Sequence, residues 1–170
     1  MPRIHVCSLF QIADVTAATG ARSLITVINQ GIYVDRPPAI APERHLQVAI
    51  SDVCEETEGH ILADSGHIQS LIDFVRAWDQ AEPLVIHCFA GVSRSTAGAF
   101  IAACTLNPQV NEAEIARRMR RASPTATPNI HLVSLADQAL GRDGRMITAI
   151  REIGRGAECF EAEPFALELY

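Results

Sequence analysis

The sequence of 170 residues contains no lysine, so all 14 of its basic side chains are arginines, and 20 acidic residues bring the formal net charge to −6. A protein that binds nucleic acid through a basic surface is therefore not expected. Hydrophobic residues make up 48% of the chain and charged residues 20%, a composition that excludes intrinsic disorder and indicates a packed domain. The length suits one domain and is short for two.

Long apolar runs are also missing. The longest candidate, residues 97–104, is far shorter than the roughly 20 apolar residues that cross a bilayer, and the first residues lack the apolar core of a secretory signal. We therefore expect a cytoplasmic protein without a membrane partner. The cysteines form no CxxC pair and are odd in number, which argues against a disulfide framework and against a zinc site: Cys7, Cys54, Cys88, Cys104 and Cys159.

Internal repeats, low-complexity tracts and a glycine-serine linker are absent, which predicts a single domain. Alternating or continuous apolar runs predict strands at residues 4–7, 24–28, 45–50 and 84–86. Helical spacing and capping residues, including a capping box at Asn111 and Glu114, predict helices at residues 11–19, 65–78, 95–106, 112–121, 130–140 and 143–153. This order indicates an α/β fold with a mostly parallel central sheet of about four or five strands flanked by helices.

The most informative stretch is LVIHCFAGVSRST, residues 84–96, which predicts a buried strand, a tight loop and the start of a helix. Gly91 in the loop permits a sharp turn or the close approach of a ligand. Backbone N–H groups that converge on one point, next to a helix N-terminus, bind an anion of the size of phosphate. The predicted phosphate-binding residues are Phe89, Ala90, Gly91, Val92, Ser93 and Arg94.

The residues around this loop have the chemistry of nucleophilic catalysis. Cys88 lies at its floor, where the N–H dipoles favour the thiolate over the thiol. Arg94 offers a planar fork that matches two phosphate oxygens. Ser95 either donates its hydroxyl to the departing sulfur or serves as a plain helix cap. We interpret His87 as a supporting residue that forms hydrogen bonds behind the loop.

The nine residues HCFAGVSRS, 87–95, resemble the signature loop of the cysteine-dependent protein phosphatases. The similarity is greatest to the dual-specificity branch, whose loops often read HCxAGxSRS. It extends more loosely from residue 24 to residue 140 and includes a later Pro-Asn pair at residues 128–129. We therefore expect a phosphatase-like domain over residues 1–155, followed by an acidic and aromatic C-terminal tail at residues 156–170. The resemblance implies no metal and no other cofactor.

The activity that this resemblance implies is hydrolysis of a phosphorylated protein or peptide at phosphotyrosine, with phosphoserine and phosphothreonine as further substrates. Cys88 would attack phosphorus, and a carboxylic acid on a separate loop would protonate the leaving oxygen. Asp52, 36 residues before Cys88 and at the end of a predicted strand, is our first choice for that acid. Asp64, 24 residues before Cys88, is the competitor, although its position also suits a helix cap.

Other functions stay open at this point. The same fold includes phosphoinositide and RNA 5′-phosphatases, but residues 89–93 contain no cation that would favour such polyanionic substrates. A non-catalytic module would bind a phosphorylated partner through an intact loop without turnover. A sulfurtransferase, which also uses a looped cysteine, would turn over thiosulfate instead.

Overall fold

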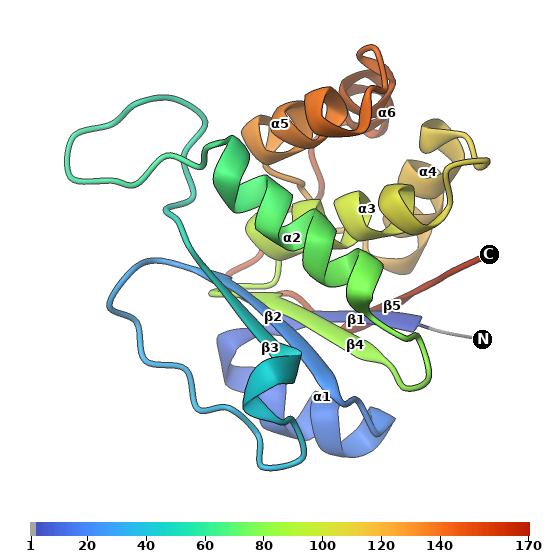
Figure 1. Cartoon of the computed structure of the whole chain (residues 1–170). Helices are drawn as coiled ribbons and strands as arrows, with labels where there is room; N and C mark the ends of the chain where they lie inside the picture. The colour runs from blue at the N-terminus through green and yellow to red at the C-terminus, as the bar shows by residue number, and fades with distance from the viewer. Residues whose placement is uncertain (1–2) are drawn as a thin grey trace.

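The computed structural model describes residues 3–170 and contains, within that range, five β-strands and six α-helices (Figure 1). The strands are β1 (Arg3–Ser8), β2 (Ser23–Ile28), β3 (His45–Ala49), β4 (Leu84–Cys88) and β5 (Phe165–Glu168). The helices are α1 (Ile12–Thr19), α2 (Ser65–Ala77), α3 (Arg94–Leu106), α4 (Glu112–Ala122), α5 (Ile130–Leu140) and α6 (Arg145–Ile153). None of these helices is long and apolar enough to cross a membrane.

The strands form one sheet in the order β3-β2-β4-β1-β5, and every neighbouring pair is parallel except β1 and β5. This confirms the predicted mostly parallel sheet of about four or five strands. The central strand β4 is buried along its whole length, which explains its continuous apolar run. The parallel strands end at one edge of the sheet, where the loops that follow β2, β3 and β4 come together.

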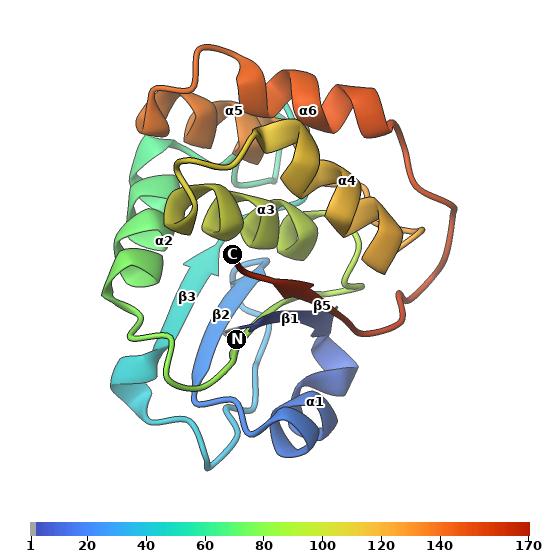
Figure 2. The same cartoon turned by 90° about the vertical axis from the view of Figure 1, so that its right-hand side faces the viewer.

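Helices cover the two faces of the sheet unequally (Figures 1 and 2). The larger core lies between the sheet and the helices α2 to α6, and the fully buried Ile86 and Phe100 are part of it. On the opposite face α1 and the loop between β2 and β3 cover a smaller cluster that includes Leu24 and Val85. Since β4 and α3 both belong to the larger core, the loop between them is anchored at its two ends.

Asp64 is the N-cap of α2. Its Oδ1 accepts a hydrogen bond from the backbone N–H of His67 at 3.0 Å, and the Asp64 N–H donates to Nδ1 of His67 at 3.0 Å. The hydrogen bond from the His67 backbone holds the pKa of the Asp64 carboxyl below its usual value. These contacts give Asp64 a structural role at the start of a helix.

One predicted capping detail is wrong. Asn111 caps α4 by accepting a hydrogen bond from the Ala113 N–H at 2.8 Å, but Glu114 does not complete a capping box. Its carboxylate contacts arginines one turn further along the same helix, with Oε1 at 3.1 Å from Nε of Arg118. The guanidinium groups attract this carboxylate away from the helix N-terminus.

We expect Asp64→Ala to lower the melting temperature by about 2–4 °C, because it removes the side-chain acceptor for the His67 N–H. Thermal unfolding followed by circular dichroism measures this change. Asp73→Ala is the matched control, because Asp73 is exposed within the same helix and its carboxylate accepts only from Gln69. Equal melting temperatures for the two variants would contradict a capping role.

Candidate active site

The loop between β4 and α3, residues 89–93, which we call the phosphate loop, is held open by hydrogen bonds to the outer side of its backbone. Four of its carbonyl oxygens accept hydrogen bonds from N–H groups elsewhere in the chain: Phe89 from Leu9 (3.1 Å), Ala90 from Ala162 (2.9 Å), Val92 from Thr127 (2.9 Å) and Ser93 from Asn129 (3.1 Å). In a trans peptide the N–H points opposite to the carbonyl, so the N–H groups that follow these carbonyls point inward. The result is a cradle of backbone donors, which suits a tetrahedral oxyanion.

Gly91 is required by the geometry of this loop for two reasons. Its φ is 76°, a left-handed conformation that side chains disfavour. A Cβ added there would also lie 3.0 Å from the carbonyl carbon of Cys7 and 3.1 Å from the backbone nitrogen of Ser8. The loop therefore packs directly against the end of β1, and only glycine fits this position without displacing backbone.

Cys88 is the last residue of β4 and is only 3% exposed at the floor of the cradle. Its Sγ accepts a hydrogen bond from the Gly91 N–H at 3.3 Å and lies 3.1 Å from Oγ of Ser95. Hydrogen bonds from two donors stabilise the negative charge of a thiolate. The N-cap of α3 is Ser93 rather than Ser95, which corrects the alternative that Ser95 is the helix cap and leaves its hydroxyl beside the sulfur.

Arg94 is the first residue of α3, and its side chain is fixed from behind. Its Nη1 donates to Oδ1 of Asn29 at 2.7 Å and to the carbonyl oxygen of Ile50 at 2.9 Å. The residue is 5% exposed, yet its Nε has no hydrogen-bond partner among residues 3–170. An unpaired buried N–H of a guanidinium costs free energy, so this atom is a donor left for a ligand.

Asp52 lies at the start of a protruding loop, residues 52–60, which we call the acid loop. The neck of the loop is closed by Ser51 and Ile61, because the Ser51 N–H donates to the Ile61 carbonyl at 2.9 Å and the Ile61 N–H donates to Ser51 Oγ at 3.0 Å. Oδ1 of Asp52 accepts from Oγ of Ser93 and from Nδ2 of Asn129, each at 2.8 Å. These contacts place the Asp52 carboxylate beside the phosphate loop.

His87 supports the loop from the opposite face of the sheet. It is fully buried, and its Nδ1 lies 3.0 Å from the Cys88 carbonyl oxygen, so this nitrogen carries the proton. Its Nε2 then accepts from Thr26 Oγ1 at 2.7 Å, and that hydroxyl accepts in turn from Nε2 of His45 at 2.7 Å. Burial lowers the pKa of His87 to about 4, so the imidazole is neutral at neutral pH.

The chain between α6 and β5 crosses the front of the cradle; we call residues 155–162 the crossing segment. Its ends are secured: the Gly156 N–H donates to Thr127 Oγ1 at 3.1 Å, and Glu161 accepts from Ser8 Oγ. A Cβ on Gly156 would lie 2.6 Å from the Thr125 carbonyl carbon, so the segment lies tightly against the turn before α5.

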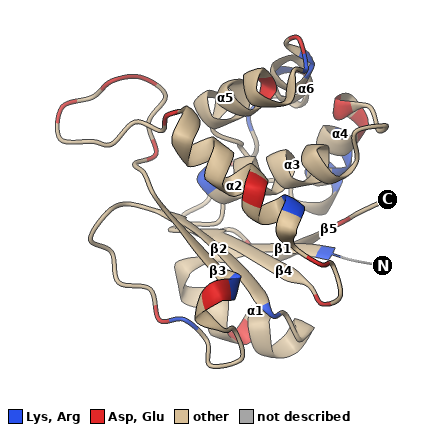
Figure 3. Ribbon diagram, viewed as in Figure 1, with Lys and Arg blue, Asp and Glu red and all other residues tan. Residues whose placement is uncertain are grey.

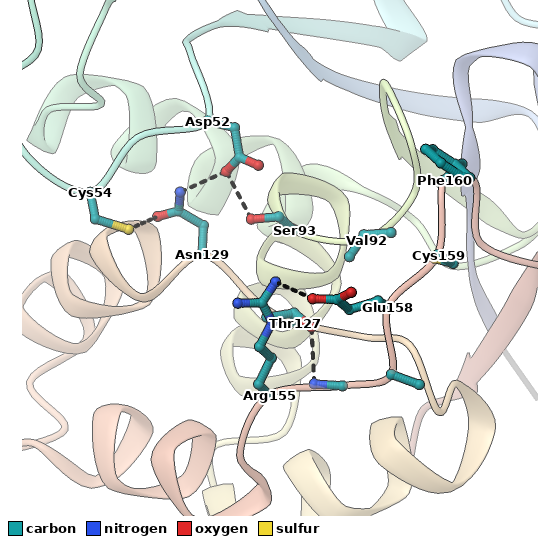
Figure 4. A pocket seen from close by; sticks show the side chains of 12 residues that line it. Asp52, Cys54, Val92, Ser93, Thr127, Asn129, Arg155, Glu158, Cys159 and Phe160 are labelled. Atoms are coloured by element: carbon teal, nitrogen blue, oxygen red, sulfur yellow. Dashed lines mark hydrogen bonds and ion pairs between the residues drawn. The ribbon is translucent and has the colours of Figure 1, made fainter.

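A pocket of about 670 Å³ lies between the acid loop and the crossing segment (Figure 4). Asp52 and Cys54 line one wall, and Val92 and Ser93 of the phosphate loop form its base. The opposite wall consists of Arg155, Gly156, Ala157, Glu158, Cys159 and Phe160. The pocket is therefore continuous with the residues that hold Asp52.

The remaining cysteines differ from Cys88 in their surroundings. Burial raises the pKa of Cys7 and of Cys104 to about 12, so both are thiols at neutral pH. Cys54 and Cys159 are exposed on opposite walls of the pocket. Cys54 Sγ lies 3.7 Å from Oδ1 of Asn129, which indicates a contact with the residue that holds Asp52.

Comparisons with known proteins agree with this geometry. The protein-tyrosine phosphatase family model matches residues 57–131, a range that includes the phosphate loop and leaves out Asp52. A search of the curated proteins finds no match. Among solved structures, Cydia pomonella PTP-2 phosphatase has a TM-score of 0.63 and 18% identity, covering 79% of this chain and 84% of its own. Human DUSP28 has a TM-score of 0.62 and 19% identity, covering 81% and 90%.

Human tyrosine phosphatase-like serine/threonine/tyrosine-interacting protein has a TM-score of 0.61 and 15% identity, covering 82% of this chain and 92% of its own. At these identities the structures show a shared fold only. A mostly parallel sheet with the loop sequence HCFAGVSRS at its edge defines a cysteine-dependent phosphatase. The chain is similar to the protein-tyrosine phosphatase family over residues 57–131, and it has a dual-specificity-like fold.

Several residues at the site were not singled out from the sequence. The sequence assigns no role to Asn29, and it indicates Asn129 only as part of a Pro-Asn pair. Asn129 has two roles, because its Oδ1 accepts from backbone N–H groups at the start of α5 while its Nδ2 donates to Asp52. The position of Asn129 at the start of a predicted helix was the only signal in the sequence.

The low pKa of His87 makes stability depend on pH. Since the folded-state pKa of about 4 is below the ordinary value of 6.5, the unfolded chain binds the proton more readily. The stability that the neutral imidazole of His87 contributes is therefore present above pH 6.5 and is lost as the pH falls toward 4. We expect His87→Gln to reduce the difference in the free energy of unfolding between about pH 7.5 and about pH 5 by about 2 kcal/mol, measured by urea titration. His60→Gln, at an exposed histidine, is the control, and equal pH dependence in both variants would contradict this account.

Proposed function

We propose that this chain hydrolyses phosphotyrosine in proteins or peptides through a cysteinyl-phosphate intermediate, with phosphoserine and phosphothreonine as further substrates. The observation that carries the proposal is the alignment of three groups on one cradle. Cys88 Sγ lies at its floor, Arg94 retains an unpaired Nε, and Asp52 is held at its rim by Ser93. A nucleophile, a charge-stabilising fork and an acid are the parts that phosphoryl transfer requires.

In the first step, the Cys88 thiolate attacks phosphorus and the bond from phosphorus to the leaving oxygen breaks. Negative charge gathers on the other phosphate oxygens, which the inward N–H groups and the guanidinium of Arg94 stabilise. The protonated carboxyl of Asp52 gives its proton to the leaving phenolate oxygen, so that tyrosine leaves as a neutral phenol. Ser93 and Asn129 hold this carboxyl in place.

In the second step, a water molecule attacks the phosphorus of the cysteinyl phosphate. The Asp52 carboxylate accepts a proton from that water, inorganic phosphate is released, and the sulfur departs as a thiolate. Oγ of Ser95 lies 3.1 Å from Sγ of Cys88, and its hydroxyl donates to the departing sulfur. The geometry supports Ser95 in this role and supports Asp52 over Asp64, which caps α2 instead.

Phosphotyrosine fits the rim of the cradle better than a short aliphatic phosphoester. The nucleophile is buried, so a longer side chain reaches it more readily. Phe89 at the rim is 48% exposed and packs edge-on against Phe10, with ring centroids 5.5 Å apart. An apolar rim of this kind accepts an aryl ring.

We propose a reducing cytoplasm as the location, because the reaction needs a reduced thiol and the cysteines among residues 3–170 are all unpaired. The basic residues of the chain are all arginines, which fits a protein encoded by a GC-rich bacterial genome.

Turnover of p-nitrophenyl phosphate tests the proposed function. We expect metal-independent hydrolysis that Cys88→Ser lowers by about 10³-fold or more, because the hydroxyl is a much weaker nucleophile at neutral pH. Cys104→Ser, at a buried thiol far along α3, is the control. Binding of a phosphotyrosine peptide without any turnover would favour a non-catalytic module, and turnover of thiosulfate would favour a sulfurtransferase.

Alkylation tests the state of the nucleophile. Iodoacetate should modify Cys88 faster than Cys7 and Cys104, and inorganic phosphate should protect it, because both anions compete for the cradle. Peptide mapping by mass spectrometry separates Cys88 from the exposed Cys54 and Cys159. Modification of Cys88 that phosphate leaves unchanged would contradict an anion site at this loop.

The leaving group tests the acid. Asp52→Asn should slow the hydrolysis of phenyl phosphate by roughly 10²–10⁴-fold, because a basic phenolate needs a proton when it leaves. An aryl phosphate with an acidic phenol should be affected much less. Asp64→Ala should leave the dependence on the leaving group unchanged, since Asp64 acts on the stability of α2. The reverse pattern in the two variants would show that Asp52 is not the acid.

A further inference from the structure

The net charge of the chain is concentrated in the acid loop and in residues 155–163, the two segments that supply the walls of the pocket, which we call the acidic walls. Residues 52–58 and 155–163 together contain seven carboxylates and one arginine, a net charge of −6. The rest of the chain contains 13 carboxylates and 13 arginines, which cancel. Figure 3 shows acidic residues, coloured red, along the protruding acid loop. The carboxylates of these two segments are Asp52, Glu55, Glu56, Glu58, Glu158, Glu161 and Glu163; Asp52 and Glu158 line the pocket itself, and the others lie next to it along the chain.

Very little in the neighbourhood neutralises these carboxylates. Glu55, Glu56 and Glu58 are exposed on the acid loop. The one arginine, Arg155, lies 3.4 Å from Oε1 of Glu158, and their side chains are 76% and 85% exposed. An ion pair in such an exposed setting contributes little and exchanges readily with another cation.

The position of the phosphoryl group fixes what else must lie in this pocket. The unpaired Nε of the buried Arg94 and the inward N–H groups place the phosphate over Cys88. The pocket of about 670 Å³ begins at Val92 and Ser93 of the same loop, and Asp52 lies on its wall (Figure 4). Residues next to a phosphotyrosine bound in the cradle therefore enter the space between the two acidic walls.

We propose that this pocket is a subsite for basic side chains that flank the phosphotyrosine, so that the preferred substrates are phosphotyrosine peptides rich in arginine or lysine. The proposal rests on the proposed function and adds to it a class of substrate. Acidic walls around a cleft raise the local concentration of cationic ligands and their rate of association. Glu158 contacts the flanking cation directly, and the glutamates of the acid loop act through their field.

The same charge distribution disfavours polyanionic substrates. A phosphoinositide headgroup or an RNA 5′ end would bring several negative charges between walls of net charge −6. Like charges brought together in this way cost free energy, and only one phosphate can occupy the cradle. A single phosphate flanked by cations meets no such repulsion.

A matched pair of phosphotyrosine peptides tests the proposal. The two peptides are identical except that the flanking positions are arginine in one and glutamate in the other. We expect kcat/KM to be about tenfold higher for the arginine peptide at about 0.02 M salt, and the ratio to approach one at about 1 M salt, where charges are screened.

A pair of triple variants tests whether the acidic walls cause the preference for the arginine peptide. Glu55→Gln/Glu56→Gln/Glu58→Gln should lower the ratio at low salt by about threefold or more, because it removes half of the net charge of the walls. Asp14→Asn/Glu43→Gln/Asp143→Asn makes the same change in the net charge of the chain at exposed positions outside both walls and should leave the ratio unchanged. Glu158→Gln should lower the ratio without any change to the acid loop.

The outcomes separate this inference from the proposed function. Equal kcat/KM for the two peptides, with hydrolysis intact, would overturn the basic subsite and leave the phosphatase activity. An equal effect of the two triple variants would overturn the role of the walls. Faster hydrolysis of a phosphoinositide micelle than of the arginine peptide would overturn the substrate class. If the protein hydrolysed neither of the two peptides nor p-nitrophenyl phosphate, the proposed function itself would be overturned.

Discussion

The phosphate loop keeps its shape because other segments bind its carbonyl oxygens from outside. A loop of backbone N–H groups that all point inward has to direct its carbonyls outward, where each needs a donor. The donors come from the end of β1, from the turn before α5 and from the crossing segment. Segments from both ends of the chain therefore determine the geometry of one short loop. The sheet and helices matter for the site mainly because they bring these donors together.

The proposed catalytic groups and the glutamates near them lie on different parts of the structure. Cys88 and Arg94 lie at the ends of buried elements, and Asn29 orients the guanidinium from the end of β2. Asp52 lies on a loop, but Ser93 and Asn129 fix its carboxylate against the rigid part of the molecule. The glutamates further along the acid loop lie beyond the neck that Ser51 closes. Their charges can act on a bound peptide without disturbing the reacting atoms.

Much of the fold follows from local signals in the sequence. The apolar run at residues 84–86 predicts a buried strand, and the periodic apolar positions after Asp64 predict α2, which the structure confirms. The strand β5 carried no comparable signal, because it is an edge strand of four residues whose pairing with β1 joins the two ends of the chain. Such pairing depends on the folded core and not on the pattern of the strand itself.

The proposed nucleophile Cys88 and the proposed phosphate-binding Arg94 could be singled out because their spacing within one loop is local. The partners of the site residues could not be predicted, because they are distant in the sequence. Asn29 and Ile50 lie 65 and 44 positions from Arg94, and Asn129 lies 77 positions from Asp52. The residues that follow a strand do not show, from the sequence alone, which distant arginine they will contact. The choice of the acid was ambiguous for the same reason, and the contact between Asp52 and Ser93 supports the proposal of Asp52 over Asp64.

The crossing segment also has a consequence for biosynthesis. Its Ala162 N–H is one of the donors that bind the outward carbonyls of the phosphate loop, and Glu161 contacts Ser8 at the end of β1. A ribosome adds these residues after β4, the loop and the helices α1 to α6 have been made. The nascent chain can therefore assemble most of its core during translation, but its anion cradle is complete only after Glu161 and Ala162 leave the exit tunnel. Completion of the anion cradle is therefore a late event in the folding of this domain, later than the packing of its core.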